Sequence, residues 1–186
     1  MESQAQTSKQ CRNFVVLLAL LVLYDWCMAK SIVYHKTPVG KLALVSNNDQ
    51  LVIVGLVGDN MPGDVVECVP GQEPSVLVRT KQQLDEYFAG TRHDFDLPLA
   101  PAGTDFQVGV WDALCTIPWG ETRNYGQIAA QVGKPKAARA VGGANNRNPI
   151  AIIIPCHRVI GANGTMVGYR GGLDIKEYLL KLEGII

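Results

Sequence analysis

Short apolar runs alternate with polar, turn-forming segments along the first third of the chain. Runs at residues 32–34, 42–45 and 51–57 are rich in Ile, Val and Leu, which is typical of β-strands. The Ser-Asn-Asn-Asp sequence at 46–49 predicts a hairpin loop between the second and third runs. Residues 58–74 are rich in Gly and Pro and are predicted to form a loop.

The apolar spacing becomes helical after this loop. Leu77, Leu84 and Phe88 share one face of a helix predicted over residues 74–90, which a Pro-Ser pair opens and a glycine closes. A small sheet with one covering helix predicts an α/β domain over residues 28–98. We find no group of residues typical of a catalytic site in this domain.

A segment with two prolines, residues 96–103, separates this domain from a second one, which we place at residues 99–186. Thr104 is a typical helix N-cap. The helix that follows is expected to run to about Cys115. Its apolar face consists of Phe106, Val110, Trp111 and Leu114.

Two short helices are predicted next, at residues 124–133 and 137–145, on either side of a Lys-Pro turn. Two short helices around such a turn are the helix-turn-helix pattern. The second helix is rich in Ala and Gly and carries one long cationic side chain, Arg139. Small residues permit tight packing against another helix, and they equally permit close approach to a nucleic-acid backbone.

Residues 150–154 are five consecutive apolar side chains, a run with the length of a fully buried strand. Pro155 ends that strand because proline has no N–H to donate. Cys156 and His157 follow directly, where a turn is expected. Thiolate is the nucleophilic form of cysteine, and a nearby imidazole can generate it near neutral pH. The pair is therefore a candidate nucleophile and base, although an isolated Cys-His pair is more often a buried structural thiol.

The net charge is zero, but its distribution is uneven. Residues 28–106 contain six Lys and Arg against ten Asp and Glu, whereas residues 107–186 contain nine against five. An acidic first half and a basic second half favour a polyanionic partner for the second half alone. The modest basic excess predicts moderate, salt-sensitive binding to DNA.

The five cysteines contain no C-x-x-C pair, so we expect free thiols in a reducing compartment, no disulfide framework and no cysteine-rich zinc site. Residues 14–24 resemble the apolar core of a signal peptide and are too short to span a bilayer comfortably. No clear cleavage site follows. We interpret residues 1–27 as an N-terminal extension without secretion function, and expect a cytoplasmic protein, or a nuclear one in a eukaryote.

Several motifs of the second half resemble one protein family. Ile-Pro-Cys-His-Arg-Val at 154–159 is similar to the active-site signature of the O6-alkylguanine-DNA alkyltransferases, also called methylated-DNA–protein-cysteine methyltransferases. Further matches are Thr-Asp-Phe-Gln at 104–107, Pro-Lys-Ala-Ala-Arg-Ala-Val-Gly at 135–142 and Tyr-Arg-Gly-Gly at 169–172. The resemblance is strong over residues 104–184 and covers 30–100 in outline.

The resemblance implies a fold and a reaction. In the family, a ribonuclease-H-like α/β domain supports a mostly helical C-terminal domain that carries the helix-turn-helix and the Pro-Cys-His-Arg turn. By residue-to-residue match, Cys156 takes the alkyl group from O6 of guanine, His157 acts as its base through a water, and Glu183 orients His157. Asn148 braces the active-site turn, and Tyr125 assists the guanine leaving group. No cofactor and no metal are implied, and a stable carbon–sulfur bond implies one turnover per molecule.

The implied partner is double-stranded DNA that carries O6-alkylguanine, bound by a monomer with no membrane partner. Arg139 would enter the duplex and fill the space of the flipped base, with the helix-turn-helix in the minor groove. Further DNA contacts are implied for Thr104, Gln107, Ala138, Ala140 and Gly142. The substrate pocket is implied to include Val159, Tyr169, Arg170 and Gly171. Activity on O4-alkylthymine stays open.

The chain departs from the family at two positions. Asn124 replaces a Ser or Thr that is common before the tyrosine, and Arg170 replaces a small residue found in some members, which bears on the alkyl groups accepted. Two other functions remain as alternatives. A lesion sensor with an inert Cys156 would bind DNA without forming an adduct. A Cys-His hydrolase would need an oxyanion hole and would turn over repeatedly.

Overall fold

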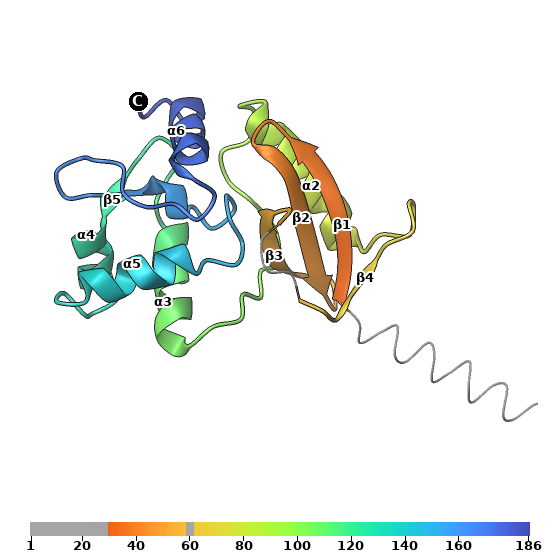
Figure 1. Cartoon of the computed structure of the whole chain (residues 1–186), viewed down its shortest axis with the longest axis horizontal. Helices are drawn as coiled ribbons and strands as arrows, with labels where there is room; N and C mark the ends of the chain where they lie inside the picture. The colour runs from red at the N-terminus through yellow and green to blue at the C-terminus, as the bar shows by residue number, and fades with distance from the viewer. Residues whose placement is uncertain (1–29, 59–61) are drawn as a thin grey trace, which may run out of the picture.

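The computed structural model describes residues 30–58 and 62–186. A sheet with one covering helix lies beside a part built mostly of helices (Figure 1). This mixed α and β architecture, with a sheet domain first and a helical domain second, confirms the predicted fold class. The extension proposed at residues 1–27 lies outside the described residues. Within the described ranges, no helix is both long enough and apolar enough to cross a membrane.

The sheet has four strands in the order β3-β2-β1-β4. They are β1 (Lys30–Thr37), β2 (Gly40–Asn47), β3 (Gln50–Leu56) and β4 (Val65–Glu67). The first three form antiparallel hairpins, which confirms the three predicted strands, and β4 pairs in parallel with β1. The prediction of a loop over residues 58–74 is wrong for the three residues of β4. These residues are extended because they pair with the edge of β1, and such long-range pairing cannot be predicted from local sequence.

Helix α2 (Ser75–Phe88) packs on the sheet, as its apolar spacing predicts. Leu77 and Leu84 are fully buried in the shared core. The residue before the helix offers no side-chain cap, and Asp49 in the turn between β2 and β3 provides one instead. Its Oδ1 accepts the N–H of Val76 at 2.9 Å, and this hydrogen bond lowers the pKa of the Asp49 carboxyl. The hairpin turn is therefore fixed to the start of the helix.

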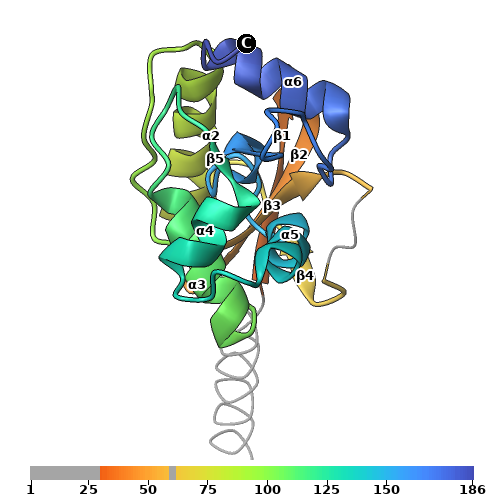
Figure 2. The same cartoon turned by 90° about the vertical axis from the view of Figure 1, so that its left-hand side faces the viewer.

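The second part contains α3 (Asp105–Cys115), β5 (Arg123–Asn124), α4 (Tyr125–Gln131), α5 (Ala138–Asn146), the 3-10 turn η1 (Cys156–Arg158), β6 (Val159–Ile160) and α6 (Leu173–Leu182). Helices α4 and α5 pack against each other and against α3, which confirms the helix-turn-helix. The short parallel pair β5–β6 connects the start of α4 to the end of η1. Helices α3 and α6 lie at opposite ends of this second part in both views (Figure 2).

Helices α3 and α4 both begin with a capping box. Thr104 accepts the backbone N–H of Gln107, and the Gln107 side chain accepts the N–H of Thr104, which makes a capping box at the start of α3. Asn124 and Gln127 make the same reciprocal pair at the start of α4. The departure at Asn124 is therefore a change of capping residue, and it keeps the start of α4 in place.

The run at 150–154 is buried, but it is not a strand. Ile150, Ile152 and Ile154 are at most 2% exposed. The segment makes only isolated bridges and turns on itself, because the N–H of Ile154 donates to the C=O of Ile150. Ile152 has φ 73°, a left-handed conformation that a β-branched residue rarely adopts. The predicted strand is wrong because an apolar run indicates burial without determining the backbone.

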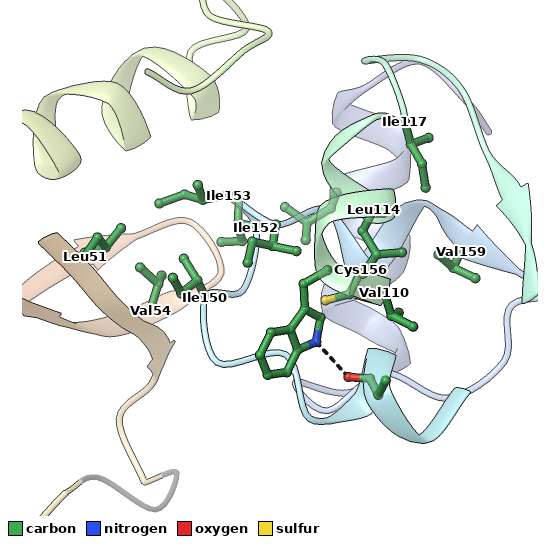
Figure 3. Close-up of a cluster of buried hydrophobic side chains, with 14 of the residues drawn as sticks. Leu51, Val54, Val110, Leu114, Ile117, Ile150, Ile152, Ile153, Cys156 and Val159 are labelled. Carbon is green, nitrogen blue, oxygen red and sulfur yellow. Dashed lines mark hydrogen bonds between the residues drawn. The ribbon is translucent and has the colours of Figure 1, made fainter. Parts of the chain in front are cut away.

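The outer edge of β3 joins the two parts. Leu51 exchanges backbone hydrogen bonds with Pro98 and Ala100, and Val54 does the same with residues 149–151. One hydrophobic cluster continues from the sheet through these contacts to α3 (Figure 3). The domain boundary expected after Pro98 falls inside the first contact, and it stays a prediction.

Candidate active site

Cys156 begins η1 directly after Pro155, whose φ of −82° and ψ of 62° turn the chain. The turn is needed because adjacent residues of an extended strand would point to opposite faces. Cys156 is 5% exposed and His157 is completely buried. The sulfur of Cys156 lies within the apolar cluster near Val110 and Leu114 (Figure 3).

Asn148 holds the turn that leads to Cys156. Its Nδ2 donates to the C=O of Ile154 at 2.8 Å, and its Oδ1 accepts the N–H of Ile150 at 3.0 Å. The side chain thereby satisfies backbone groups that a strand ladder would otherwise satisfy. Asn148 therefore holds the backbone of this turn through both ends of its side-chain amide.

Glu183, at the end of α6, lies against His157. Its Oε1 is 2.7 Å from Nε2 of His157, and it also accepts Nη2 of Arg158 at 3.0 Å and the hydroxyl of Tyr87 at 2.7 Å. Its Oε2 accepts Nε of Arg158 at 2.8 Å. The structure thus joins His157, which follows Cys156 directly in the sequence, to Glu183, and it adds Arg158 and Tyr87, which sequence reasoning missed.

The charges at this site follow from burial and from these partners. Burial alone would raise the pKa of Glu183, but hydrogen bonds from His157 and Arg158 outweigh it and hold the pKa at about 2. An ionised carboxylate only accepts hydrogen bonds, so Nε2 of His157 carries the ring hydrogen. The other ring nitrogen, Nδ1, is buried and has no hydrogen-bond partner in the described part of the chain. A neutral His157 therefore presents a free lone pair on Nδ1.

Burial keeps the thiol and the imidazole neutral at rest. It raises the pKa of Cys156, opposed by hydrogen bonds from Asn148 and Tyr169 and by the positive charge of Lys176. It also lowers the pKa of His157, although Glu183 acts in the opposite direction. A neutral thiol is a weak nucleophile, so Cys156 must lose its proton before it can attack. The neutral imidazole of His157 is the candidate base for that proton.

Lys176 is a site residue that sequence reasoning missed. Its side chain is fully buried, and Nζ donates to the C=O groups of Val159 at 2.5 Å and Val167 at 3.1 Å. Burial lowers the pKa of its ammonium group, whereas the nearby Cys156 raises it. Lys176 and Glu183 lie on the apolar face of α6. Two charged residues on an otherwise apolar face are the feature of the sequence from which a functional role of Lys176 could have been predicted. Val159 is itself completely buried.

A cavity of about 110 Å³ opens beside Cys156. Tyr169, Arg170 and Gly171 line it, and so does Asn148, whereas Val159, also expected at the substrate pocket, is not among the lining residues. Apolar residues of the sheet domain complete its wall; they are Val39, Leu42, Ile53, Val54 and Leu56. The lining is mostly apolar, so the cavity suits an alkyl group more than a charged one.

The helix-turn-helix places its residues on an exposed surface. Arg139 and Ala140 are exposed on α5, and Ala138 and Gly142 are half-buried. Tyr125, at the start of α4, is half-buried: burial raises the pKa of its hydroxyl, and the nearby Cys156 adds to the increase. Its hydroxyl donates to the C=O of Val167 at 3.4 Å.

The helix-turn-helix packs on α3 through Trp111. The indole N–H of Trp111 donates to the C=O of Ala144 at 3.0 Å, and Figure 3 shows this hydrogen bond as a dashed line.

No three His, Cys, Asp or Glu side chains lie close enough to hold a metal ion in residues 30–58 and 62–186. Cys11 and Cys27 fall outside those ranges. Cys68 and Cys115 are free thiols in the described part, remote in sequence from the site.

Comparison with known families assigns both parts of the chain. Residues 31–101 match the family described as 6-O-methylguanine DNA methyltransferase, ribonuclease-like domain. Residues 105–185 match the family described as 6-O-methylguanine DNA methyltransferase, DNA binding domain. The two matches cover most of the sequence, and the fold that they imply agrees with the sheet and helix-turn-helix described above.

Individual relatives carry the same name. A methylated-DNA–protein-cysteine methyltransferase of Methanosarcina acetivorans is 52% identical over 149 residues, which cover 80% of this chain and 95% of the relative. The one from Mycobacterium leprae is 51% identical over 147 residues, 79% of this chain and 88% of the relative. A solved structure is also similar, the crystal structure of Mycobacterium tuberculosis OGT in complex with DNA. Its protein chain is 45% identical in sequence to this chain and superposes with a TM-score of 0.74, and the match covers 83% of this chain and 91% of the Mycobacterium tuberculosis chain.

These matches show that the chain belongs to the 6-O-methylguanine DNA methyltransferase family. The resemblance stated from the motifs is confirmed, and so is the enzyme class, methylated-DNA–protein-cysteine methyltransferase. DNA repair by alkyl transfer is confirmed as the function of the family to which the chain belongs.

Proposed function

We propose that this chain repairs DNA by moving an alkyl group from O6 of guanine to the sulfur of Cys156. The observation that carries the proposal is the buried arrangement of Cys156, His157 and Glu183 beside an apolar cavity. Membership of the family supports it, and so does the DNA complex of the Mycobacterium tuberculosis relative.

The reaction is a displacement at the alkyl carbon. Nδ1 of His157 accepts the thiol proton of Cys156 through a bridging water, and Glu183 stabilises the imidazolium that forms. The sulfur bonds to the alkyl carbon while the bond from that carbon to O6 breaks. The electron pair of the broken bond remains on guanine, and Tyr125 donates a hydrogen bond or proton to the ring, which improves the leaving group. Asn148 keeps the turn of Cys156 in place during this step.

The product is a thioether, which is stable, so each molecule reacts once. The reaction needs no cofactor because sulfur, base and acid all come from the chain. O4 of alkylated thymine is a similar exocyclic oxygen, and activity on it stays open. A reduced Cys156 is required, which suits the cytoplasm or, in a eukaryote, the nucleus. The proposed active form is a monomer.

Double-stranded DNA reaches this site through the surface of the helix-turn-helix. A stacked guanine cannot meet the buried sulfur, so the base must rotate out of the duplex at a cost of about a few kcal/mol. Arg139 is exposed on α5 and fills the space that the base leaves. Ala138, Ala140 and Gly142 let the backbone approach in the minor groove. Thr104 and Gln107 cap α3, and their contacts to DNA remain a prediction.

The flipped base occupies the cavity next to Cys156. Tyr169 and Gly171 line the cavity. Val159 is fully buried and its C=O accepts a hydrogen bond from the ammonium group of Lys176, so a contact from its backbone to the base edge remains a prediction. Arg170 also lines the cavity, so it limits the room for bulky alkyl groups. The apolar wall from the sheet domain faces the alkyl group.

The first test is the intact mass of the full chain after reaction with excess duplex that carries one O6-methylguanine, followed by peptide mapping. We expect one added methyl group per molecule, located on Cys156. Cys156→Ala should gain no methyl group, whereas the matched variant Cys115→Ala, which removes an exposed thiol, should react like the unaltered chain. An unmodified protein that still binds the lesion would refute the transfer and favour a lesion sensor.

A further inference from the structure

Four donors converge on the carboxylate of Glu183. Nε2 of His157 and Nη2 of Arg158 reach Oε1 from η1, and Nε of Arg158 reaches Oε2. The fourth donor comes from elsewhere: the hydroxyl of Tyr87, on α2 of the sheet domain, donates to Oε1 at 2.7 Å. Lys176 of α6 is the other charge that acts on His157. Tyr87 and His157 therefore share one oxygen of the same carboxylate.

The ring of Tyr87 is held in place on several sides. Its centroid lies 5.4 Å from Phe88, 5.4 Å from Phe95 and 5.3 Å from Trp119, and its side chain is completely buried. Burial raises the pKa of its hydroxyl, and the charge of Glu183 adds to the increase, so the hydroxyl keeps its hydrogen and donates it. A rigid donor fixes an acceptor more effectively than a mobile one.

We propose that Tyr87 is a positioning residue of the active site: α2 holds its hydroxyl so that it orients Oε1 of Glu183 toward Nε2 of His157. The inference deepens the proposed function and rests on it for its catalytic meaning. The sheet domain then does more than support the fold, because it supplies one atom of the hydrogen-bonded chain that runs through Glu183 to His157.

A second consequence follows from the shared oxygen. The hydroxyl of Tyr87 neutralises part of the negative charge on Oε1. Without it, Oε1 attracts the hydrogen on Nε2 of His157 more strongly, and the imidazole becomes easier to protonate on Nδ1. A protonated His157 cannot accept the thiol proton, so the reaction should fail at a higher pH than before.

Tyr87→Phe tests this role because it removes the hydroxyl and keeps the ring. The rate of benzyl transfer from free O6-benzylguanine to Cys156 is measured against pH in the full chain, with no DNA present. The acidic limb of this profile should shift to higher pH by about half a pH unit. The reason is that the variant loses a hydrogen bond to the charged Glu183, which contacts the base His157. Phe88→Leu is the matched control, because it disturbs the packing of the Tyr87 ring and leaves its hydroxyl in place.

An acidic limb that moves in Tyr87→Phe and stays in place in Phe88→Leu supports the proposal. A limb that is unchanged in Tyr87→Phe, or that moves equally in both variants, overturns it. The same profile is measured for alkylation of Cys156 by iodoacetamide, located by peptide mapping, which needs no recognition of guanine. This second profile decides the role of Tyr87 even if the unaltered chain transfers no benzyl group, an outcome that would count against the proposed function alone.

Discussion

Glu183 makes a large contribution to stability, and Glu183→Gln measures it. The substitution keeps the shape of the side chain and removes its charge. Arg158, which is 5% exposed, then remains buried without a counter-charge. Removing one partner of a buried ion pair costs about 3–5 kcal/mol. We therefore expect the free energy of unfolding to fall by about this amount at neutral pH.

The pKa of Glu183 gives a second magnitude. It falls from 4.5 to about 2 in the folded chain. This difference corresponds to about 3 kcal/mol, at about 1.4 kcal/mol per unit. Because the folded-state pKa lies below the unfolded one, the stabilisation is present above pH 4.5 and is lost as the pH falls toward about 2. The two magnitudes agree.

Urea denaturation followed by circular dichroism measures both signatures. At neutral pH the variant should be about 3 kcal/mol less stable, and the difference from the unaltered chain should shrink as the pH approaches about 2. Glu177→Gln is the matched control on the same helix, since Glu177 forms an exposed pair with Lys181 and should cost less than about 1 kcal/mol. A loss below about 1 kcal/mol in Glu183→Gln, or one that is equal at neutral and acidic pH, would refute the reasoning.

Three further substitutions test single residues. Arg139→Ala should slow repair of duplex DNA at least about tenfold and change the reaction with free O6-benzylguanine less than about twofold, because only duplex requires base flipping; equal losses would exclude the role. Tyr125→Phe should slow transfer by about tenfold or more and leave DNA affinity nearly intact; a loss of affinity without a loss of rate would contradict it. Lys176→Met should slow alkylation of Cys156 by iodoacetamide about tenfold at neutral pH, because the charge that favours the thiolate is gone. An unchanged rate in a folded Lys176→Met variant, checked by circular dichroism, would show that its charge does not reach the sulfur.

Local patterns in the sequence predict much of the fold. The strands β1 to β3, the helices α2 and α3 and the helix-turn-helix follow from apolar spacing, turn residues and caps such as Thr104. The segment at 150–154 does not, because its conformation depends on the side chain of Asn148 and on pairing with β3. Strand β4 was missed for a similar reason, since its only partner is the distant edge of β1.

Some residues of the candidate site can likewise be predicted from the sequence, and others cannot. Cys156, His157 and Glu183 can be found from the signature motif and the resemblance, and the structure joins His157 to Glu183. Tyr87 cannot be found in this way, because 96 positions separate it from Glu183 and its own neighbours in sequence indicate only a helix. A residue that acts through a tertiary contact has no local sequence signal.

The outer edge of β3 has a consequence for how the chain is made. Residues 98–100 and 149–151 occupy this edge in the folded protein. Synthesis proceeds from the N-terminus, so the sheet emerges from the ribosome long before residues 149–151 do. Until then this part of the β3 edge is unpaired, and unpaired edges associate with other strands. Chains that stop before residue 149 should therefore aggregate, and the full chain depends on its active-site segment to complete its sheet.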